Sequence, residues 1–179
     1  MRHLAKIRTR TEGSALLEFA VALPVLVLFI VGIYDFSGAL NQKQKIGHAA
    51  QEGAVFAGAQ PMTDMDPSSS DPESLHPVLE VVFSSLAANG VLPAGNWSGC
   101  TFTPPVHTPS TLDWQYNITG CSPDTLTVEI DRGVVDPGTP ASVRTTVKVS
   151  YPYHWRFNSV IQVASTTDLS ETASVHNQM

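Results

Sequence analysis

Glu18 is the residue whose chemistry stands out first, because it lies inside a long apolar run. The run covers residues 14–34 and reads SALLEFAVALPVLVLFIVGIY. A charge at the centre of a bilayer costs roughly 2.5–3.5 kcal/mol on insertion scales, so a carboxylate in such a run is a candidate for function. Glu18 lies near one end of the run, where the cost is smaller. A carboxyl that reaches the interface or stays protonated remains an alternative interpretation.

The residues before Glu18 favour a specific chemistry. Ser14 precedes Glu18 by four residues, which places the two side chains on one face of a helix. Residues 13–19 resemble the processing site of type IV-like prepilins, and this resemblance implies a cut of the peptide bond after Gly13, which would give Ser14 a free amine. That cation could pair with Glu18 of the same chain or of a neighbour and relieve the cost of the buried carboxylate. The cut would also remove four basic residues that hold the N-terminus in the cytoplasm, namely Arg2, Lys6, Arg8 and Arg10.

Other kinds of chemistry find little support in the sequence. No G-x-S-x-G, H-E-x-x-H, C-x-x-C or Walker motif occurs, and the six histidines are isolated from any nucleophile along the chain. One acidic stretch lacks the glycine and the terminal glutamate of a calcium-binding EF-hand loop; its acids are Asp64, Asp66, Asp71 and Glu73. We therefore predict no enzyme, no cofactor, no metal site and no small-molecule substrate.

The two cysteines, Cys100 and Cys121, permit one disulfide if this part of the chain is exported. Such a bond would close a loop of about 20 residues and add roughly 3 kcal/mol of stability by the chain-entropy relation. Two free, buried thiols are the alternative.

The apolar run has the length of a membrane span. Its 21 residues reach about 30 Å as a helix, which matches the hydrocarbon core of a bilayer. A secretory signal is an alternative, since small residues follow at 37–39, but its apolar region is normally shorter. A buried core helix is another, although one small domain does not need a helix that is apolar on every side. Pro24 lies inside the run, where membrane helices tolerate a kink more readily than soluble ones.

Charge divides the chain at the apolar run. Before it stand four bases and one acid, Glu12, whereas from Asp35 onward 14 acids face 6 bases. A basic segment ahead of a span predicts a cytoplasmic N-terminus and a periplasmic C-terminal body. Outside the first ten residues no basic stripe exists, so we expect no nucleic-acid partner.

Several segments in and after the apolar run resemble known families. Residues 13–19, GSALLEF, are similar to the processing site of type IV-like prepilins, where a membrane peptidase cuts after the glycine and leaves glutamate at position five. Residues 15–20, the pair Leu23-Pro24 and residues 32–36 resemble the signature of the TadE-like family. So does the segment IGHAAQEGA at residues 46–54.

The TadE-like resemblance implies a pseudopilin-like component of the tight-adherence (Flp) pilus machinery. Its implied partners are the lipid bilayer, other pilin or pilus-assembly subunits and a prepilin peptidase. Glu18, Phe19 and Pro24 would then belong to the helix that enters the membrane and the assembly. Flp major pilins usually carry tyrosine after the glutamate and are shorter, so Phe19 and the long body favour the minor, TadE-like class.

The organisation expected from these features has five parts. They are a basic leader at 1–13, a transmembrane helix at 14–34, an outward extension of that helix at 35–59, a flexible Pro/Ser/acidic linker at 60–76 and an extracytoplasmic head at 77–179. The extension carries small residues at three- and four-residue spacing, which allow close approach to another helix or to the protein's own body.

The head is expected to be α+β. Residues 77–89 predict a second helix that begins at proline and ends at Asn-Gly. Residues 91–123 are rich in turn signals. Residues 125–132 and 141–153 alternate apolar and polar side chains, which predicts two half-buried strands paired antiparallel, and residues 166–176 predict a third.

Three functions fit this sequence. The first is a structural or assembly subunit of a surface pilus in the bacterial inner membrane. The second is a membrane-anchored periplasmic binding module of unknown ligand. The third is a secreted domain whose first 39 residues are a removed signal.

Overall fold

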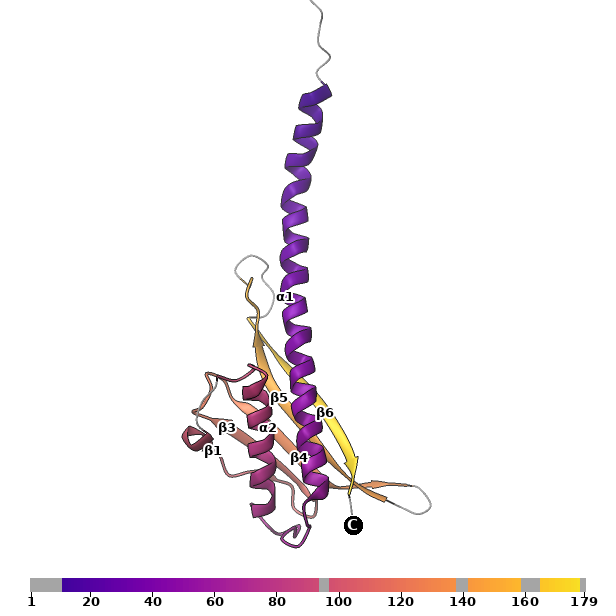
Figure 1. Ribbon diagram of the computed structural model, residues 1–179, viewed down its shortest axis with the longest axis vertical. Helices are drawn as coiled ribbons and strands as arrows, with labels where there is room; N and C mark the ends of the chain where they lie inside the picture. Colours follow the sequence, from indigo (N-terminus) through magenta and orange to yellow (C-terminus); the bar gives the residue numbers. More distant parts are fainter. Residues whose placement is uncertain (1–10, 94–96, 138–141, 159–164, 178–179) are drawn as a thin grey trace, which may run out of the picture.

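A long helix and a small α+β head make up the molecule, as the sequence predicts (Figure 1). The computed structural model describes residues 11–93, 97–137, 142–158 and 165–177. The helices are α1 (Thr11–Ala59) and α2 (His76–Ala88), with short 3-10 turns at Glu73–Leu75 and Trp97–Gly99. The strands are β1 (Thr101–Phe102), β2 (Val106–His107), β3 (Asp113–Thr119), β4 (Leu126–Asp136), β5 (Ser142–His154) and β6 (Thr166–His176).

Helix α1 is one continuous rod that joins the predicted span to its predicted extension. Its 49 residues give a length of about 74 Å at the usual helical rise. Pro24 lies inside it without ending it. The helix ends at Ala59 because Pro61 follows, and the residue before a proline avoids helical backbone angles.

The sheet is antiparallel throughout, with the strand order β1-β3-β4-β5-β6 and with β2 also paired to β3. The predicted pairing of the two alternating segments is confirmed as the β4–β5 ladder. Leu126, Val128 and Ile130 of β4 are buried on the face that the helices cover, and Val147 and Val149 of β5 join them. The period-2 alternation therefore predicts correctly which side of each strand is buried.

Strand β3 was not predicted from the sequence, where residues 91–123 were described only as rich in turn signals. Trp114, Tyr116 and Ile118 are fully or almost fully buried, and polar residues stand between them. The segment DWQYNIT does alternate between polar and apolar residues. It is only seven residues long, however, and the surrounding Pro, Gly and Ser residues indicate turns more strongly. The sheet is thus wider than predicted, and β3 lies next to β4.

The C-terminal half of α1, residues 35–59, packs on the sheet and on α2 through small side chains. Ala49, Ala50, Ala54 and Ala57 have no exposed surface. A Cβ atom at Gly53 would lie 2.5 Å from Val82 Cγ2 of α2, so only glycine fits there at this spacing. Small residues let the helix axes approach closely, which buries apolar surface on both partners.

Arg132 of β4 holds the C-terminal end of α1. Its guanidinium donates to the carbonyl oxygens of Gln60 (2.8 Å) and Pro61 (3.4 Å), and its Nε donates to Thr145 Oγ1 (3.3 Å). Burial lowers the pKa of Arg132, and the carboxylate of Asp64 partly offsets that effect. Since α1 has no basic residue in its last turn, this buried cation supplies the charge that a helix C-terminus favours.

Cys100 and Cys121 are joined by a disulfide, with their Cα atoms 4.7 Å apart. Cys100 directly precedes β1, and only Gly120 separates Cys121 from the end of β3, so the bond fastens the β1–β3 pair. Trp97 packs on Phe102 and on Phe83 of α2 beside it, with ring centroids 4.8 and 5.1 Å apart. The bond and the rings secure the edge of the sheet.

The segment predicted as a flexible linker, residues 60–76, is tied to the head by hydrogen bonds. Trp114 Nε1 donates to the Ser69 carbonyl (3.0 Å), and the Tyr116 hydroxyl donates to Asp71 Oδ1 (2.9 Å). Leu75 is fully buried in the core. The division of the chain at this segment stays a prediction. These contacts hold the connection between the C-terminal end of α1 and the start of α2 against the head.

Candidate membrane and assembly site

None of residues 14–34 of α1 is buried, and most of this stretch stands clear of the head, which it first meets near Tyr34 (Figure 1). The helix is long and apolar enough to cross a membrane. Its large exposed side chains point to all sides; among them are Leu16, Phe19, Val21, Leu26, Phe29 and Ile33. An apolar surface of this extent is stable only when lipid or another apolar partner covers it.

The structure brings Ser14 and Glu18 together near the start of this span. Ser14 Oγ donates to Glu18 Oε1 at 3.1 Å, one helical turn away. Gly13 lies in the same helix, which begins at Thr11. Phe19 and Pro24 occupy the span beyond Glu18, and Phe19 is exposed. The arrangement presents one carboxylate on an otherwise apolar rod.

Asp35 marks the place where α1 enters the head. It is the first buried residue after the span, at 6% exposure. Its carboxylate accepts hydrogen bonds from the Tyr153 hydroxyl (2.9 Å) and from the backbone amides of Arg156 (3.2 Å) and Phe157 (3.3 Å). These partners lie at the end of β5 and just after it, so one carboxylate fastens the β5–β6 connection to the helix. We call this region, formed by Asp35, Tyr153, Arg156 and Phe157, the neck.

The protonation of the neck follows from these contacts. Burial acts to raise the pKa of Asp35, but the hydrogen bonds from Tyr153 and the two amides outweigh it and hold this pKa below its ordinary value. The pKa of Tyr153 is raised by burial and by its hydrogen bond to Asp35. Tyr153 is therefore the donor, and Asp35 is the charged acceptor.

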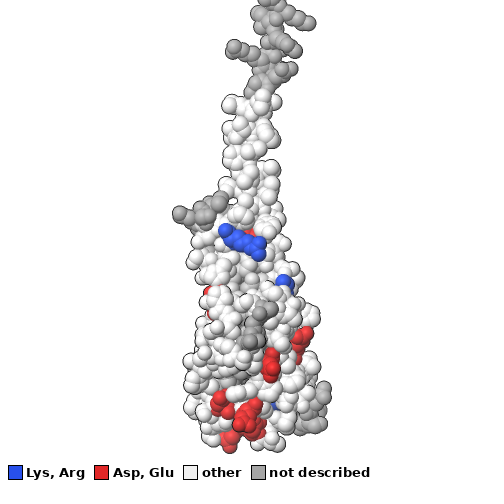
Figure 2. Space-filling model, turned by 60° about the vertical axis from the view of Figure 1, so that its left-hand side comes forward, with Lys and Arg blue, Asp and Glu red and all other residues white. Residues whose placement is uncertain are grey.

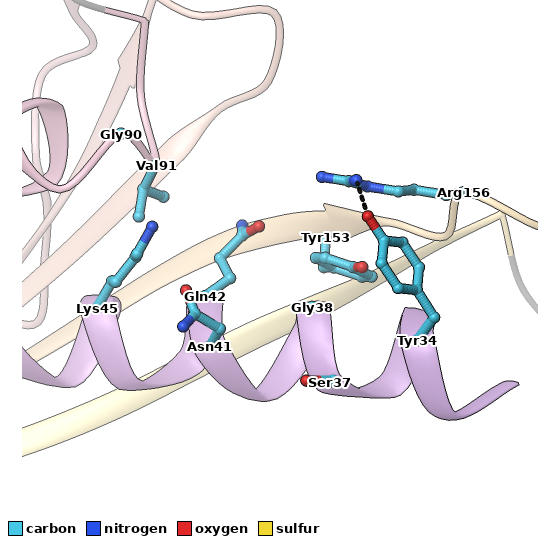
Figure 3. Close-up of a pocket in the computed structure, with 10 residues that line it drawn as sticks. All are labelled: Tyr34, Ser37, Gly38, Asn41, Gln42, Lys45, Gly90, Val91, Tyr153 and Arg156. Carbon is cyan, nitrogen blue, oxygen red and sulfur yellow. Dashed lines mark hydrogen bonds between the residues drawn. The ribbon is translucent and has the colours of Figure 1, made fainter. Parts of the chain in front are cut away.

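Gly38 makes the neck possible. A Cβ atom at this position would lie 2.6 Å from Tyr153 Oη, so any side chain here would push the tyrosine off the helix. Figure 3 shows the Tyr153 ring lying against α1 at Gly38. Asp35, Gly38 and Tyr153 were not among the site residues predicted from the sequence. The available signal was an acid placed directly at the end of the apolar run.

A cavity of about 360 Å³ opens beside the neck. One side of it is α1 from Tyr34 to Lys45; the other sides are Tyr153 and Arg156 and the turn Gly90-Val91 after α2. Figure 3 shows Tyr34 and Arg156 meeting at one end, where Arg156 donates to the Tyr34 hydroxyl at 3.4 Å. Lys45 rises from the helix at the other end.

Charge is unevenly placed on the head. On the face that Figure 2 shows, basic side chains lie close to where the helix leaves the head, and acidic side chains gather mainly toward the opposite end. Within the described part of the chain, no group of three or more His, Cys, Asp or Glu side chains could hold a metal ion.

The comparisons with known proteins concern this same helix. A family model described as TadE-like protein matches residues 13–55, which confirms the resemblance found in the sequence. The matched segment runs from Gly13 through the span, the neck end of α1 and most of its packed half. None of the curated proteins and none of the solved structures matches the chain.

Proposed function

We propose that the protein is a membrane-anchored structural component of a tight-adherence (Flp) pilus system, of the TadE-like minor-pilin type. The observation that carries this proposal is the position of the family match. Residues 13–55 contain the exposed span, the Ser14–Glu18 pair and the helix face that holds the head. The resemblance thus covers the parts that a pilin-like subunit uses to anchor and to assemble.

The proposed topology places the N-terminus in the cytoplasm and the head in the periplasm. Four bases precede the span in the sequence, and such residues stay on the cytoplasmic side. The disulfide between Cys100 and Cys121 fits an oxidising compartment outside the cytoplasm. A pilus subunit of this kind needs no catalytic centre, so its proposed role is structural.

The proposed processing step cuts the peptide bond after Gly13. The freed amine of Ser14 would then lie in the same helical turn as Glu18, whose carboxylate already accepts from Ser14 Oγ. An ammonium–carboxylate pair in an apolar medium is stronger than one in water. Pairing with Glu18 of an adjacent subunit would join two helices through this contact.

N-terminal sequencing of the protein purified from membranes tests this step. With an active prepilin peptidase we expect a chain that starts at Ser14. When an inactive peptidase replaces the active one, the chain should start at Met1. A start at Met1 in the presence of active peptidase would contradict processing. A start at Leu40, directly after a removed 39-residue signal, would contradict the membrane anchor itself, because the span would have been removed.

The assembly role of Glu18 is tested separately with Glu18→Ala. We expect surface pili to be lost while the subunit still accumulates in the membrane. Leu17→Ala, at the exposed neighbouring position, is the matched control and should leave the pilus count unchanged. Normal pili in the Glu18→Ala strain would refute the role given to this carboxylate.

A further inference from the structure

Two basic side chains that line the neck cavity take part in none of the ion pairs found among the described residues. From Asp35 onward the chain has six Lys and Arg residues, and the structure describes all of them. Three form ion pairs, namely Lys43 with Glu171, Arg144 with Asp136 and Lys148 with Glu129. Arg132 is buried against carbonyl oxygens. The remaining two, Lys45 and Arg156, form no ion pair with any described carboxylate, and both line the neck cavity.

The cavity offers the chemistry of an anion site. Besides the two cations, it is lined by the side-chain amides of Asn41 and Gln42 and by Tyr34. Arg156 is exposed, so its guanidinium keeps donors free beyond the bond to Tyr34. A planar guanidinium suits the oxygens of a phosphate group. Asp35 offsets part of the charge of Arg156, but Lys45 leaves the site with a net positive charge.

The position of the cavity indicates which kind of molecule would present a phosphate group to it. Tyr34 is the last residue of the proposed span, and the headgroup layer extends about 5–7 Å beyond the hydrocarbon core, or four to five helical residues. Arg156 touches Tyr34 and therefore lies at the level of that layer. Lys45 lies further from the span, with its ammonium on the water side of the cavity.

Aromatic side chains surround the same level. Tyr34 and Phe36 are largely exposed, at 57% and 59%. Phe157 packs edge-on against Tyr34 with 6.1 Å between ring centroids, and Trp155 packs against Tyr153 at 5.2 Å. Tyr and Trp collect at membrane–water interfaces, where one end of the ring is apolar and the other is hydrated. A soluble phosphate compound would not require such surroundings.

The geometry points to a binding site for the phosphate headgroup of an anionic lipid in the periplasmic leaflet, at the Arg156 end of the neck cavity, with Lys45 at the opposite end adding positive charge. This inference rests on the proposed membrane span, because the span fixes the level of the headgroups. The bound headgroup would fasten the head to the bilayer surface, in addition to the anchor that α1 provides.

Native mass spectrometry of the full chain in detergent tests the site, with phosphatidylglycerol and phosphatidylcholine of identical acyl chains as probes. One base near a membrane surface contributes about a fivefold change in affinity, and less when it lies further out. We expect Arg156→Gln to weaken phosphatidylglycerol binding about fivefold, Lys45→Gln about two- to threefold, and the double variant about tenfold. Phosphatidylcholine binding should stay unchanged.

Lys43→Gln is the matched control, because it removes one charge from the same helix at a residue already paired with Glu171. It should leave phosphatidylglycerol binding within about 1.5-fold of the original, since a paired exposed charge contributes little. Equal loss in Lys43→Gln and Lys45→Gln would overturn the site in favour of general charge attraction. Undiminished binding by the double variant would overturn it as well. Thermal unfolding of each variant verifies that the head remains folded.

Two further experiments distinguish an error in the lipid assignment from an error in the proposed membrane span. If millimolar inorganic phosphate displaces phosphatidylglycerol from the original chain, the ligand is a soluble phosphate and the lipid assignment is wrong. If alkaline carbonate extracts the full chain from cell membranes, the span itself is wrong, and the proposed function fails together with this inference. Retention after carbonate treatment, with lipid selectivity lost in the double variant, is the expected result.

Discussion

The two halves of α1 differ in how they carry their apolar side chains. Residues 14–34 carry large side chains on every side and none is buried, whereas residues 35–59 bury mainly alanines and glycines on one face and expose polar side chains on the other. A fluid bilayer accepts large side chains all round, while a packed protein partner requires close approach along one stripe. Side-chain size and one-sidedness therefore separate the two halves, in addition to the higher apolar content of residues 14–34.

The largest effect should come from filling the close contact in the packed half. Gly53→Leu forces a side chain into the space that Val82 occupies, and overpacking of this kind costs about 2–3 kcal/mol. The matched change in the exposed half is Gly32→Leu, where a Cβ atom would meet nothing within 4 Å. Thermal unfolding of the head in detergent should show a large loss for Gly53→Leu and none for Gly32→Leu. Equal effects would contradict the distinction between the halves.

A smaller effect is expected at the neck, where the halves meet. Asp35→Asn removes the charge that accepts from Tyr153 and two backbone amides, which should cost about 1–2 kcal/mol because charge-assisted hydrogen bonds are replaced by weaker ones. Faster hydrogen exchange at the amides of Arg156 and Phe157 would report it. Glu52→Gln, an exposed acid on the same helix, is the control and should leave both amides protected.

The same carboxylate gives a dependence on pH. Because the pKa of Asp35 is lower in the folded protein than its ordinary value of about 3.9, its stabilising contribution is complete above that value. The contribution is lost as the pH falls through the lowered pKa. Stability measured from pH 6 downward should therefore decline more steeply in the original chain than in Asp35→Asn. Parallel curves would show that Asp35 contributes nothing to the neck.

The smallest effect belongs to the exposed ion pair of Lys43 with Glu171, which links α1 to β6 at 3.2 Å. Both side chains are partly solvated, and pairs of this type contribute about 0–1 kcal/mol. Lys43→Ala should lower the unfolding free energy by less than about 0.5 kcal/mol in chemical denaturation. A loss above 2 kcal/mol would mean that polar contacts, and not small-residue packing, hold the helix on the sheet.

The sequence was informative where a pattern is periodic and local. The span, the helix of small residues and the alternating strands β4, β5 and β6 follow directly from residue spacing, and the geometry of Ser14 and Glu18 follows from their separation by four. Strand β3 could not be recognised from the sequence, because turn-forming residues surround its short alternating pattern. The neck was not predictable, because Asp35 and Tyr153 are 118 residues apart and only tertiary packing brings them together.

Arg132 illustrates the same limit from another side. In the sequence it is one polar residue in an alternating strand, but in the fold it is fully buried against the carbonyl oxygens that end α1. Only the position of that helix end explains why a guanidinium lies in the core. The candidate lipid site likewise depends on which bases remain unpaired, and pairing is a property of the folded sheet.

Labelling of single cysteines in intact membranes tests the central claim most directly. Phe29 and Val55 are both exposed on α1, at 68% and 59%, so the protein itself protects neither. We predict that a membrane-impermeant maleimide labels Val55→Cys but not Phe29→Cys in spheroplasts, and that both react once detergent replaces the bilayer. The native cysteines are joined and should not react. Equal labelling of both positions in intact membranes would contradict the division of α1 between lipid and head.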